Sequence, residues 1–348
     1  MNQKISWIDN LRAVACMMVV MIHASTAQVV NFAAIHSVDW SVANLLNSAS
    51  RVCVPLFFMI SGYLFFGEKS AEKRHFLRIG LCLLFYSAVS LIYILSFTNV
   101  GFWPSLRLIL QKPVFYHLWF FYAIVVIYLL SPLIKVKQVP GKYLLVAGLL
   151  LGVLANPQLP ALRIDRVAIL PLNLYIGGNT FYYVLYALMG RAIGMMDTQK
   201  SGVTPVACGL FILSTLGVAW GTFHQSLINQ NFADTYYVYT GPLVFISAMS
   251  LFVIGKNALA SRVLPGLGII SRHSLAIYGF HALIIIGLRG ARIGFPQWPL
   301  VISPSCSCAA CSAACCWRCC WRKLIGGSGS VSWRSAISPV PAVTACRR

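Results

Sequence analysis

The sequence contains very little charge. Only 10% of its 348 residues are Asp, Glu, Lys or Arg, and just seven are acidic. Soluble domains carry about 25% charged residues, so this chain cannot cover a water-facing surface. Hydrophobic residues make up 59% of it, and apolar runs of membrane-spanning length recur along it. The composition therefore predicts an all-α polytopic membrane protein.

Several common functional signals are also absent. The sequence has no phosphate-binding glycine loop, no HExxH or GxSxG motif and no paired carboxylates. No acid falls clearly at mid-membrane depth and no internal repeat is evident, which weighs against a proton-coupled transporter built from two halves. The apolar segments lack the alternation of a membrane β-barrel, and no cleavable signal is expected before the first of them.

Nine apolar segments predict transmembrane helices. They lie roughly at residues 11–30, 48–66, 77–97, 117–134, 143–154, 181–195, 206–220, 237–254 and 274–288. A tenth span is expected after residue 300, where it would return the chain to the side on which it began. We therefore expect about ten transmembrane helices embedded in a lipid bilayer.

The net charge of +20 does not predict nucleic-acid binding, because the basic residues lie in short segments between apolar spans, where Lys and Arg set membrane orientation. Fourteen of them fall on the same side of the membrane as Lys4, and seven fall on the other side. This bias predicts a cytoplasmic N-terminus. The segments 31–47 and 156–180 are then expected to be outer loops, long enough to form a lid.

The composition changes abruptly near residue 300, which predicts a transmembrane domain at 1–300 and a separate tail at 301–348. The tail contains eight of the twelve cysteines, six basic residues and no acid. Residues 315–322 read CCWRCCWR, which TGC, TGG and CGC codons can encode. Read one base earlier, the same codons give (L/M/V)LLALLLA, a good transmembrane sequence. We hypothesise that a frameshift near residue 300 replaces the tenth helix.

Two alternatives to a frameshift stay open. The tail could be genuine but unstructured, or it could bind a metal. Cys316 and Cys319 have C-x-x-C spacing, but no second properly spaced pair accompanies them, so the zinc signal is weak. A disulfide framework is not expected, because the tail would face the reducing cytoplasm or end in disorder.

The first span carries two polar groups on one face. Arg12 and His23 are eleven residues apart with no charge between them, which on a helix means nearly the same direction and about 16 Å of rise. Ionisable groups inside a span are usually functional, although His23 could be a neutral ring hydrogen-bonded within the bundle and Arg12 an interfacial anchor. Asp9 lies one turn before Arg12 and could hold its guanidinium in place.

The second and third spans offer further candidates. Arg51 opens the second span on its outer side, and Ser61 lies where a ligand or another helix could approach closely. Both are candidate substrate contacts, with helix packing as the alternative. Arg74 and Arg78 at the cytoplasmic entrance of the third span suit a phosphate-bearing ligand, or they simply set orientation.

Two later spans carry the remaining candidates for substrate binding. Trp119 lies near the start of the fourth span, where an interfacial aromatic belt is the alternative. Ser274, Tyr278 and His281 share one helical face, because they are spaced i, i+4 and i+7. This second polar stripe is a natural partner for the stripe that contains His23.

A series of sequence blocks then resembles a known family. Arg12-x10-His23 within IDNLRAVA…VVMIH, followed in order by FFMISGYLF, FLRIG, HLWFF and SLAIYGFH, resembles the acyltransferase-3 family of multi-pass membrane acyltransferases. The resemblance runs from about residue 5 to about residue 298. Within the family, GRAIGMMDTQ and NFADTYY look like segments of the members that O-acetylate the enterobacterial common antigen.

The resemblance implies a ten-helix bundle in the bacterial inner membrane. It implies transfer of an acetyl group from cytoplasmic acetyl-CoA to a sugar hydroxyl of a polysaccharide or lipid-linked glycan, here N-acetylglucosamine of the enterobacterial common antigen, with no metal. The family's essential arginine and histidine match Arg12 and His23. Some members place a catalytic Glu in a late helix, and this sequence has no equivalent acid.

The residue chemistry fits this expectation. His23 can take a proton from the sugar hydroxyl, which general-base catalysis typically accelerates by about 10²–10⁴-fold. Arg12, steadied by Asp9, can bind donor phosphates or the thioester region, and Arg74 and Arg78 can hold the nucleotide end. A route through an acetyl-His23 intermediate stays open. The alternative function is a carrier or exporter of a polar lipid-linked sugar.

Overall fold

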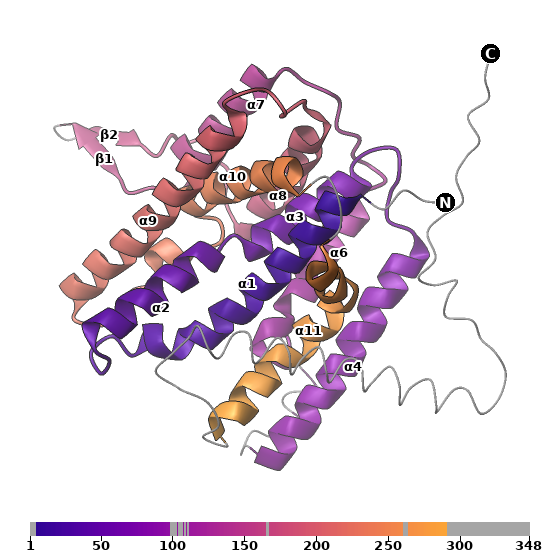
Figure 1. Ribbon diagram of the computed structural model, residues 1–348, viewed down its shortest axis with the longest axis vertical. Coiled ribbons are helices and arrows are strands. Elements are labelled where there is room, and N and C mark those ends of the chain that lie inside the picture. The colour runs from indigo at the N-terminus through magenta and orange to yellow at the C-terminus, as the bar shows by residue number, and fades with distance from the viewer. Residues whose placement is uncertain are drawn as a thin grey trace.

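The protein is a bundle of helices (Figure 1). The computed structural model describes residues 5–97, 103, 107, 109, 111–164, 167–259 and 264–290. The helices are α1 (Ser6–Val30), α2 (Ser37–Ser50), α3 (Cys53–Phe65), α4 (Lys73–Phe97), α6 (Trp119–Leu130), α7 (Gly141–Ala147), α8 (Asn179–Met195), α9 (Val203–Asn229), α10 (Pro242–Ala258) and α11 (Pro265–Gly290). Short helical turns are η1 (Tyr116–Leu118), η2 (Gly148–Leu154) and η3 (Thr235–Tyr237).

A helix lies at each of the nine predicted spans, so the helical prediction is confirmed. Within the described residues, six helices are long and apolar enough to cross a membrane, and the helices at Tyr116–Leu130 and Gly141–Leu154 are apolar but shorter. The chain is therefore a multi-pass membrane protein. The predicted tenth span, the tail and the frameshift hypothesis all lie outside the described residues.

Helix α1 runs through the middle of the bundle and contacts α2, α3, α10 and α11 (Figure 1). Its residues are apolar on several faces, which is typical of a helix that is enclosed by others. Leu11, Ala15 and Val20 are completely buried. Near its start, the side-chain amide of Asn10 donates to the carbonyl of Leu259 and accepts from the backbone N–H of Leu264. These bonds fix α1 against the α10–α11 connection.

The prediction that residues 31–47 form a loop is wrong, because most of them belong to α2. This helix packs against α1 and α9. The indole N–H of Trp40 donates to the carbonyl of Val29, and Asn44 donates to the carbonyl of Ala219. Tryptophan and asparagine suggested a loop in the sequence, but here they hydrogen-bond between packed helices, as polar residues commonly do in membrane bundles.

Helices α2 and α3 form one path that is interrupted at Arg51–Val52. The interruption lies one turn before Pro55. A proline has no backbone N–H and its ring clashes with the carbonyl four residues earlier, so the helix breaks there. The break lies next to the cavities described below.

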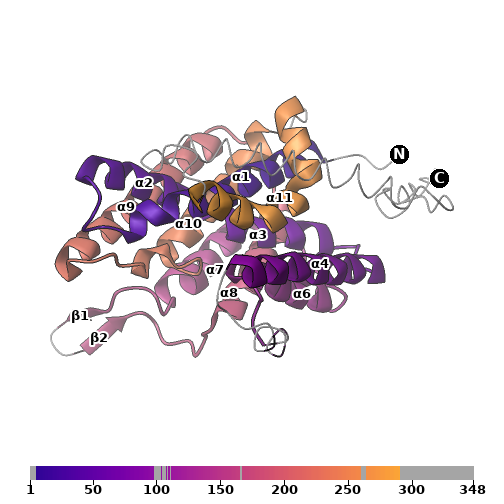
Figure 2. The same ribbon diagram turned by 90° about the horizontal axis from the view of Figure 1, so that it is seen from below.

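A small β-hairpin departs from the all-helical prediction in the segment 156–180. Strands β1 (Leu162–Ile164) and β2 (Val167–Leu170) pair antiparallel, and the hairpin projects from the bundle (Figures 1 and 2). Asn156 anchors its base by donating to the carbonyls of Gly152 and Thr240. No described residue of the hairpin lines either of the cavities below, but Asn179, near the end of the segment 156–180, lines one of them.

Candidate active site

His23 lies in a cluster of aromatic and imidazole rings contributed by three segments. Its ring centroid is 4.9 Å from that of His281 on α11 and 5.3 Å from that of Tyr116 in η1. His117, also in η1, lies 5.1 Å from His281. The polar stripe on α1 and the polar stripe on α11 therefore meet, as their spacing in the sequence suggested.

The hydrogen bonds of the two neighbouring histidines fix their tautomers. His281 Nδ1 is 2.7 Å from the carbonyl oxygen of Tyr278, and His117 Nε2 is 3.2 Å from the carbonyl oxygen of Gly279. A carbonyl oxygen only accepts, so each of these nitrogens carries the hydrogen. The remaining nitrogens, His281 Nε2 and His117 Nδ1, are buried acceptors with no hydrogen-bond partner.

A cavity of about 20 Å³, here called the narrow cavity, lies beside His23. Its polar and aromatic lining includes His23, Cys53, His117, Trp119, Tyr239 and Tyr278. This volume accommodates about one water-sized group. The hydroxyl of Tyr278 donates to the carbonyl of His117, which joins α11 to η1 at the cavity wall. In the described part of the chain, no group of histidines, cysteines and acids is arranged to hold a metal ion.

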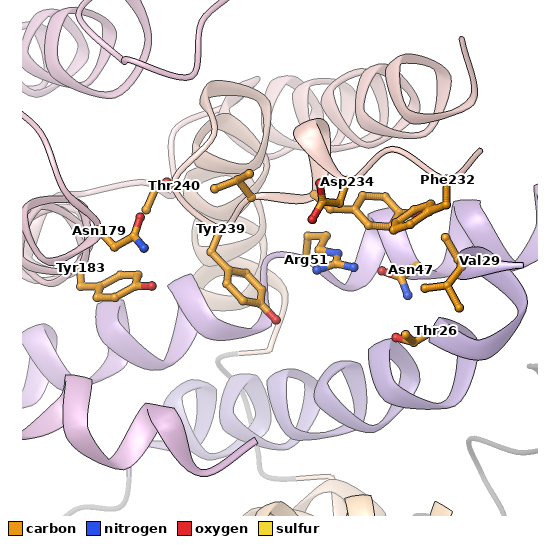
Figure 3. Close-up of a pocket in the computed structure, with 13 residues that line it drawn as sticks. Thr26, Val29, Asn47, Arg51, Asn179, Tyr183, Phe232, Asp234, Tyr239 and Thr240 are labelled. Atoms are coloured by element: carbon orange, nitrogen blue, oxygen red, sulfur yellow. The ribbon is translucent and has the colours of Figure 1, made fainter. Parts of the chain in front are cut away.

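A second cavity of about 270 Å³, here called the wide pocket, lies near the end of α1 (Figure 3). Its polar lining residues are Thr26, Asn47, Arg51, Asn179, Asp234 and Thr240, and its tyrosines are Tyr183, Tyr237 and Tyr239. Tyr239 lines both cavities. Thr26 lies one helical turn beyond His23 and on the same face of α1. The wide pocket and the narrow cavity therefore adjoin the same turn of this helix.

Arg12 lies toward the opposite end of α1. Its Nη1 is 2.9 Å from Asp9 Oδ1, and the hydroxyl of Ser271 donates to the same carboxylate oxygen. The Arg12 side chain as a whole is 29% exposed. Arg78 on α4 and Tyr128 on α6 lie within electrostatic reach of it. Asp9 thus holds the guanidinium of Arg12 as predicted from their spacing.

The same end of the bundle carries exposed ion pairs. Arg74 Nε is 3.0 Å from Glu72 Oε2, and Lys135 Nζ is 2.7 Å from Glu68 Oε1. The hydrogen bond from Lys135 lowers the pKa of the Glu68 carboxyl. Since this pKa is depressed, any stabilisation from the pair is present above the ordinary carboxyl pKa and is lost as the pH falls through the lowered value.

Comparison with known proteins shows the family to which the chain belongs. The family described as an acyltransferase domain, family 3, matches residues 5–318. The chain belongs to the acyltransferase-3 family. It is therefore an acyltransferase, and its membrane helices and buried histidine cluster belong to an enzyme. The transporter alternative gains no support from this match.

One curated protein shares a segment with this acyltransferase. A serine/alanine racemase from Enterococcus gallinarum is 33% identical over 133 residues, which is 34% of this chain. The matched segment spans only 18% of the racemase. Most of the racemase therefore lies outside the match. No solved structure gives a significant match to the chain.

The structure places the predicted site residues of this acyltransferase in different regions. Tyr278 and Trp119 line the narrow cavity, Arg51 lines the wide pocket, and His281 contacts the ring of His23. Ser61 lines neither cavity, and its hydroxyl donates to the carbonyl of residue 57 in its own helix. The adjacent Gly62 provides the close helix approach, because its Cα lies against the backbone of Ala187 on α8.

Sequence reasoning missed three groups that lie around His23. His117 carried a usable signal, because it is a histidine within an apolar segment. Cys53 and Tyr239 carried none, since an apolar sequence containing Cys or Tyr is ordinarily core. Only the packing of α3 and the η3–α10 connection against α1 brings these two side chains to the cavity.

Proposed function

We propose that this acyltransferase moves an acetyl group from acetyl-CoA to a hydroxyl of a cell-surface polysaccharide sugar. The observation that carries the proposal is the position of His23, which lines a one-water cavity and contacts a buried histidine whose free nitrogen is an acceptor. A base in a small, enclosed site is suited to activating a hydroxyl, which is a poor nucleophile when protonated.

The reaction balances with His23 as the only proton carrier. One ring nitrogen of His23 takes the hydroxyl proton as the sugar oxygen attacks the thioester carbonyl carbon. The carbon–sulfur bond then breaks, and His23 returns the proton to the coenzyme A thiolate. The products are an acetyl ester and free coenzyme A.

The donor is proposed to enter from the end of the bundle at which α1 begins. Arg78 lies within electrostatic reach of Arg12 there, and guanidinium groups bind phosphates and carbonyl oxygens well. Arg12 lies about 16 Å along the helix from His23, so an elongated donor can have its thioester near His23 and its polar end among the arginines. Asp9 and Arg74 would complete this donor site.

The acceptor, the membrane and the orientation of the chain are proposed from the sequence resemblance. We propose N-acetylglucosamine of the enterobacterial common antigen as the acceptor, with the protein in the bacterial inner membrane and its N-terminus in the cytoplasm. The excess of basic residues on the side of Arg74 and Arg78 supports this orientation. Acetyl-CoA would then be used from the cytoplasm, and the acceptor would reach the other end of α1.

Acetyl transfer in membranes tests the function. Membranes with the full chain, and membranes with a version whose tail reading frame is restored, would receive labelled acetyl-CoA and acceptor glycan. We expect glycan-dependent consumption of acetyl-CoA and label in the glycan. Arg12→Gln should raise the KM for acetyl-CoA by about 10–100-fold, because it removes a charged hydrogen bond worth roughly 1.5–3 kcal/mol.

Arg272→Gln provides a matched control, since Arg272 is exposed and bonds to a carbonyl in its own helix. Its KM for acetyl-CoA should match that of the wild type. If neither version of the chain consumed acetyl-CoA at normal membrane abundance, while the glycan crossed the membrane, a carrier function would replace the proposed one.

His281 is proposed to position His23 rather than to contact the acceptor. It is 0% exposed and lines neither cavity. Its ring lies 4.9 Å from that of His23, and its Nε2 is a buried acceptor that we propose serves an N–H of His23 during the reaction. His281→Asn can keep the donor to the Tyr278 carbonyl but loses this acceptor, whereas His281→Gln can replace the acceptor. We expect the Asn variant to lose about tenfold or more in kcat with unchanged KM values.

A higher kcat for the Gln variant than for the Asn variant would support a positioning role of His281, because a role in packing alone does not require the acceptor. Equal losses in the two variants, or losses that appear in KM alone, would contradict the positioning role.

A further inference from the structure

The wide pocket contains a cation whose orientation is fixed before any ligand binds. The guanidinium carbon of Arg51 lies 4.0 Å from the centre of the Tyr237 ring. The hydroxyl of Tyr237 donates to Asn44 Oδ1 at 2.6 Å, and Asn44 donates to the carbonyl of Ala219 on α9. This series of contacts connects Arg51 to the rigid bundle. Stacking of this kind pre-organises the guanidinium and lowers the entropy lost when it binds a ligand.

Two polar atoms of the wide pocket lack partners. The amide nitrogen of Asn47 donates to the carbonyl of Ile22 at 3.2 Å and to the hydroxyl of Ser25 at 2.9 Å. These contacts fix the orientation of the amide, because the carbonyl can only accept. They leave Asn47 Oδ1 as a buried acceptor and Arg51 Nε as a buried donor, neither with a hydrogen-bond partner. Unpaired buried polar atoms are costly and suggest a missing ligand.

A hydroxyl group matches this pair. It can accept from a donor such as Arg51 Nε–H, and it can donate to an acceptor such as Asn47 Oδ1. In the view of Figure 3, Arg51 lies between Asp234, Asn47 and Tyr239. The exposed carboxylate of Asp234 offers a further acceptor, and the tyrosine rings offer flat apolar faces. A ring that carries hydroxyl groups at its edge and apolar C–H groups on its faces can bond to these polar atoms and pack on the tyrosine rings at the same time.

The size and charge of the wide pocket further restrict the class of ligand that it can bind. Its volume of about 270 Å³ is slightly below the roughly 300–1,000 Å³ of pockets for drug-sized ligands, so it fits one ring rather than an oligosaccharide. Arg51 and Asp234 are the charged side chains among the described residues that line it, and their charges cancel. A neutral sugar ring is therefore favoured over an anionic headgroup.

The wide pocket lies close to the proposed base. Asn47 donates to the carbonyl of Ile22, the residue before His23, and Tyr239 lines both the wide pocket and the narrow cavity. We propose that the wide pocket is an acceptor subsite that binds one neutral pyranose ring and directs one of its hydroxyls into the narrow cavity beside His23. The role as acceptor subsite rests on the proposed acetyl transfer, but binding of the sugar does not.

Binding and kinetics test the subsite separately. The full chain carrying His23→Ala would be purified in detergent, and methyl β-N-acetylglucosaminide would be titrated by saturation-transfer NMR. We expect saturable binding that Arg51→Gln and Asp234→Asn each weaken by about tenfold or more, since each removes a charged hydrogen bond. Asp39→Asn is the matched control, because Asp39 lies in the first turn of α2 and does not line the wide pocket.

In acetyl transfer with His23 present, the two pocket variants should raise the KM for the acceptor by a similar factor and leave the KM for acetyl-CoA unchanged. Asp234 is exposed, so its variant is expected to fold normally even if Arg51→Gln does not. Absence of sugar binding by folded protein, or equal binding by wild type, Asp234→Asn and Asp39→Asn, would overturn the subsite.

The outcomes separate the two proposals. Sugar binding that depends on Arg51 and Asp234 in a chain that transfers no acetyl group would leave the sugar pocket in place and remove the acetyltransferase function. Acetyl transfer whose acceptor KM is unaffected by both variants would leave the function in place and remove the pocket.

Discussion

Replacing His23 with alanine is expected to lower the kcat for acetyl transfer by about 10²–10⁴-fold, the usual contribution of a positioned general base. His23 borders the narrow cavity and contacts His281, and alanine removes the only group there that we assign to carry the proton. The KM for acetyl-CoA should change little, because Arg12 lies about three turns away. Initial rates of label transfer into acceptor glycan measure both quantities.

His224→Ala is the matched control for this prediction. His224 also lies on a long apolar helix, α9, but it is exposed and stacks on Trp220 away from both cavities. Its kcat should remain at the wild-type level. Full transfer by a correctly folded His23→Ala protein would show that another group acts as the base and that the proposed site is wrong.

Replacing Gly62 with alanine is expected to destabilise the bundle severely. An added Cβ would lie 1.9 Å from the carbonyl oxygen of Ala187 on α8, far inside van der Waals contact. The obstacle is backbone, so α3 and α8 would have to separate. Overpacking of a rigid core costs about 1–3 kcal/mol and occasionally more, and here we expect about 3 kcal/mol or more. Thermal unfolding in detergent and the abundance of the protein in membranes measure the effect.

Gly80→Ala is the control for this substitution. Gly80 also lies within an apolar helix, α4, but a Cβ there meets no atom within 4 Å. Alanine has the higher helix propensity by about 1 kcal/mol, so this variant should be as stable as the wild type or more so. A Gly62→Ala protein as stable as Gly80→Ala would mean that α3 and α8 do not pack as closely as described.

The residues closest to the proposed chemistry show how far sequence reasoning reached. Arg12, His23 and Asp9 were found from spacing along one helix, and the structure confirms the contact between Arg12 and Asp9. The meeting of His23 with His281 followed from two polar stripes on separate apolar helices. A helix is periodic, so a sequence pattern identifies the face on which a side chain lies.

Other features depended on which helices pack together. The segment 31–47 is expected to be an outer loop, but most of it is a helix that is fixed to α1, because the indole N–H of Trp40 and the amide of Asn47 donate to carbonyls on α1. The sequence did predict a close helix approach at Ser61–Gly62, and the structure confirms it at Gly62, which contacts α8. Hydrogen bonds between segments distant in sequence have no local pattern.

The sequence by itself determined the membrane class, the positions of nine helical spans and the polar stripe of α1, because low charge, long apolar runs and helical spacing are local properties. Only the tertiary structure decided that Arg51, Asn47 and Asp234 share one cavity and that Tyr239 lines both this cavity and the narrow cavity beside His23. These residues come from α2, its end and the connection between α9 and α10. A cavity exists only where such segments pack together, so its lining is a property of packing and not of the order of residues.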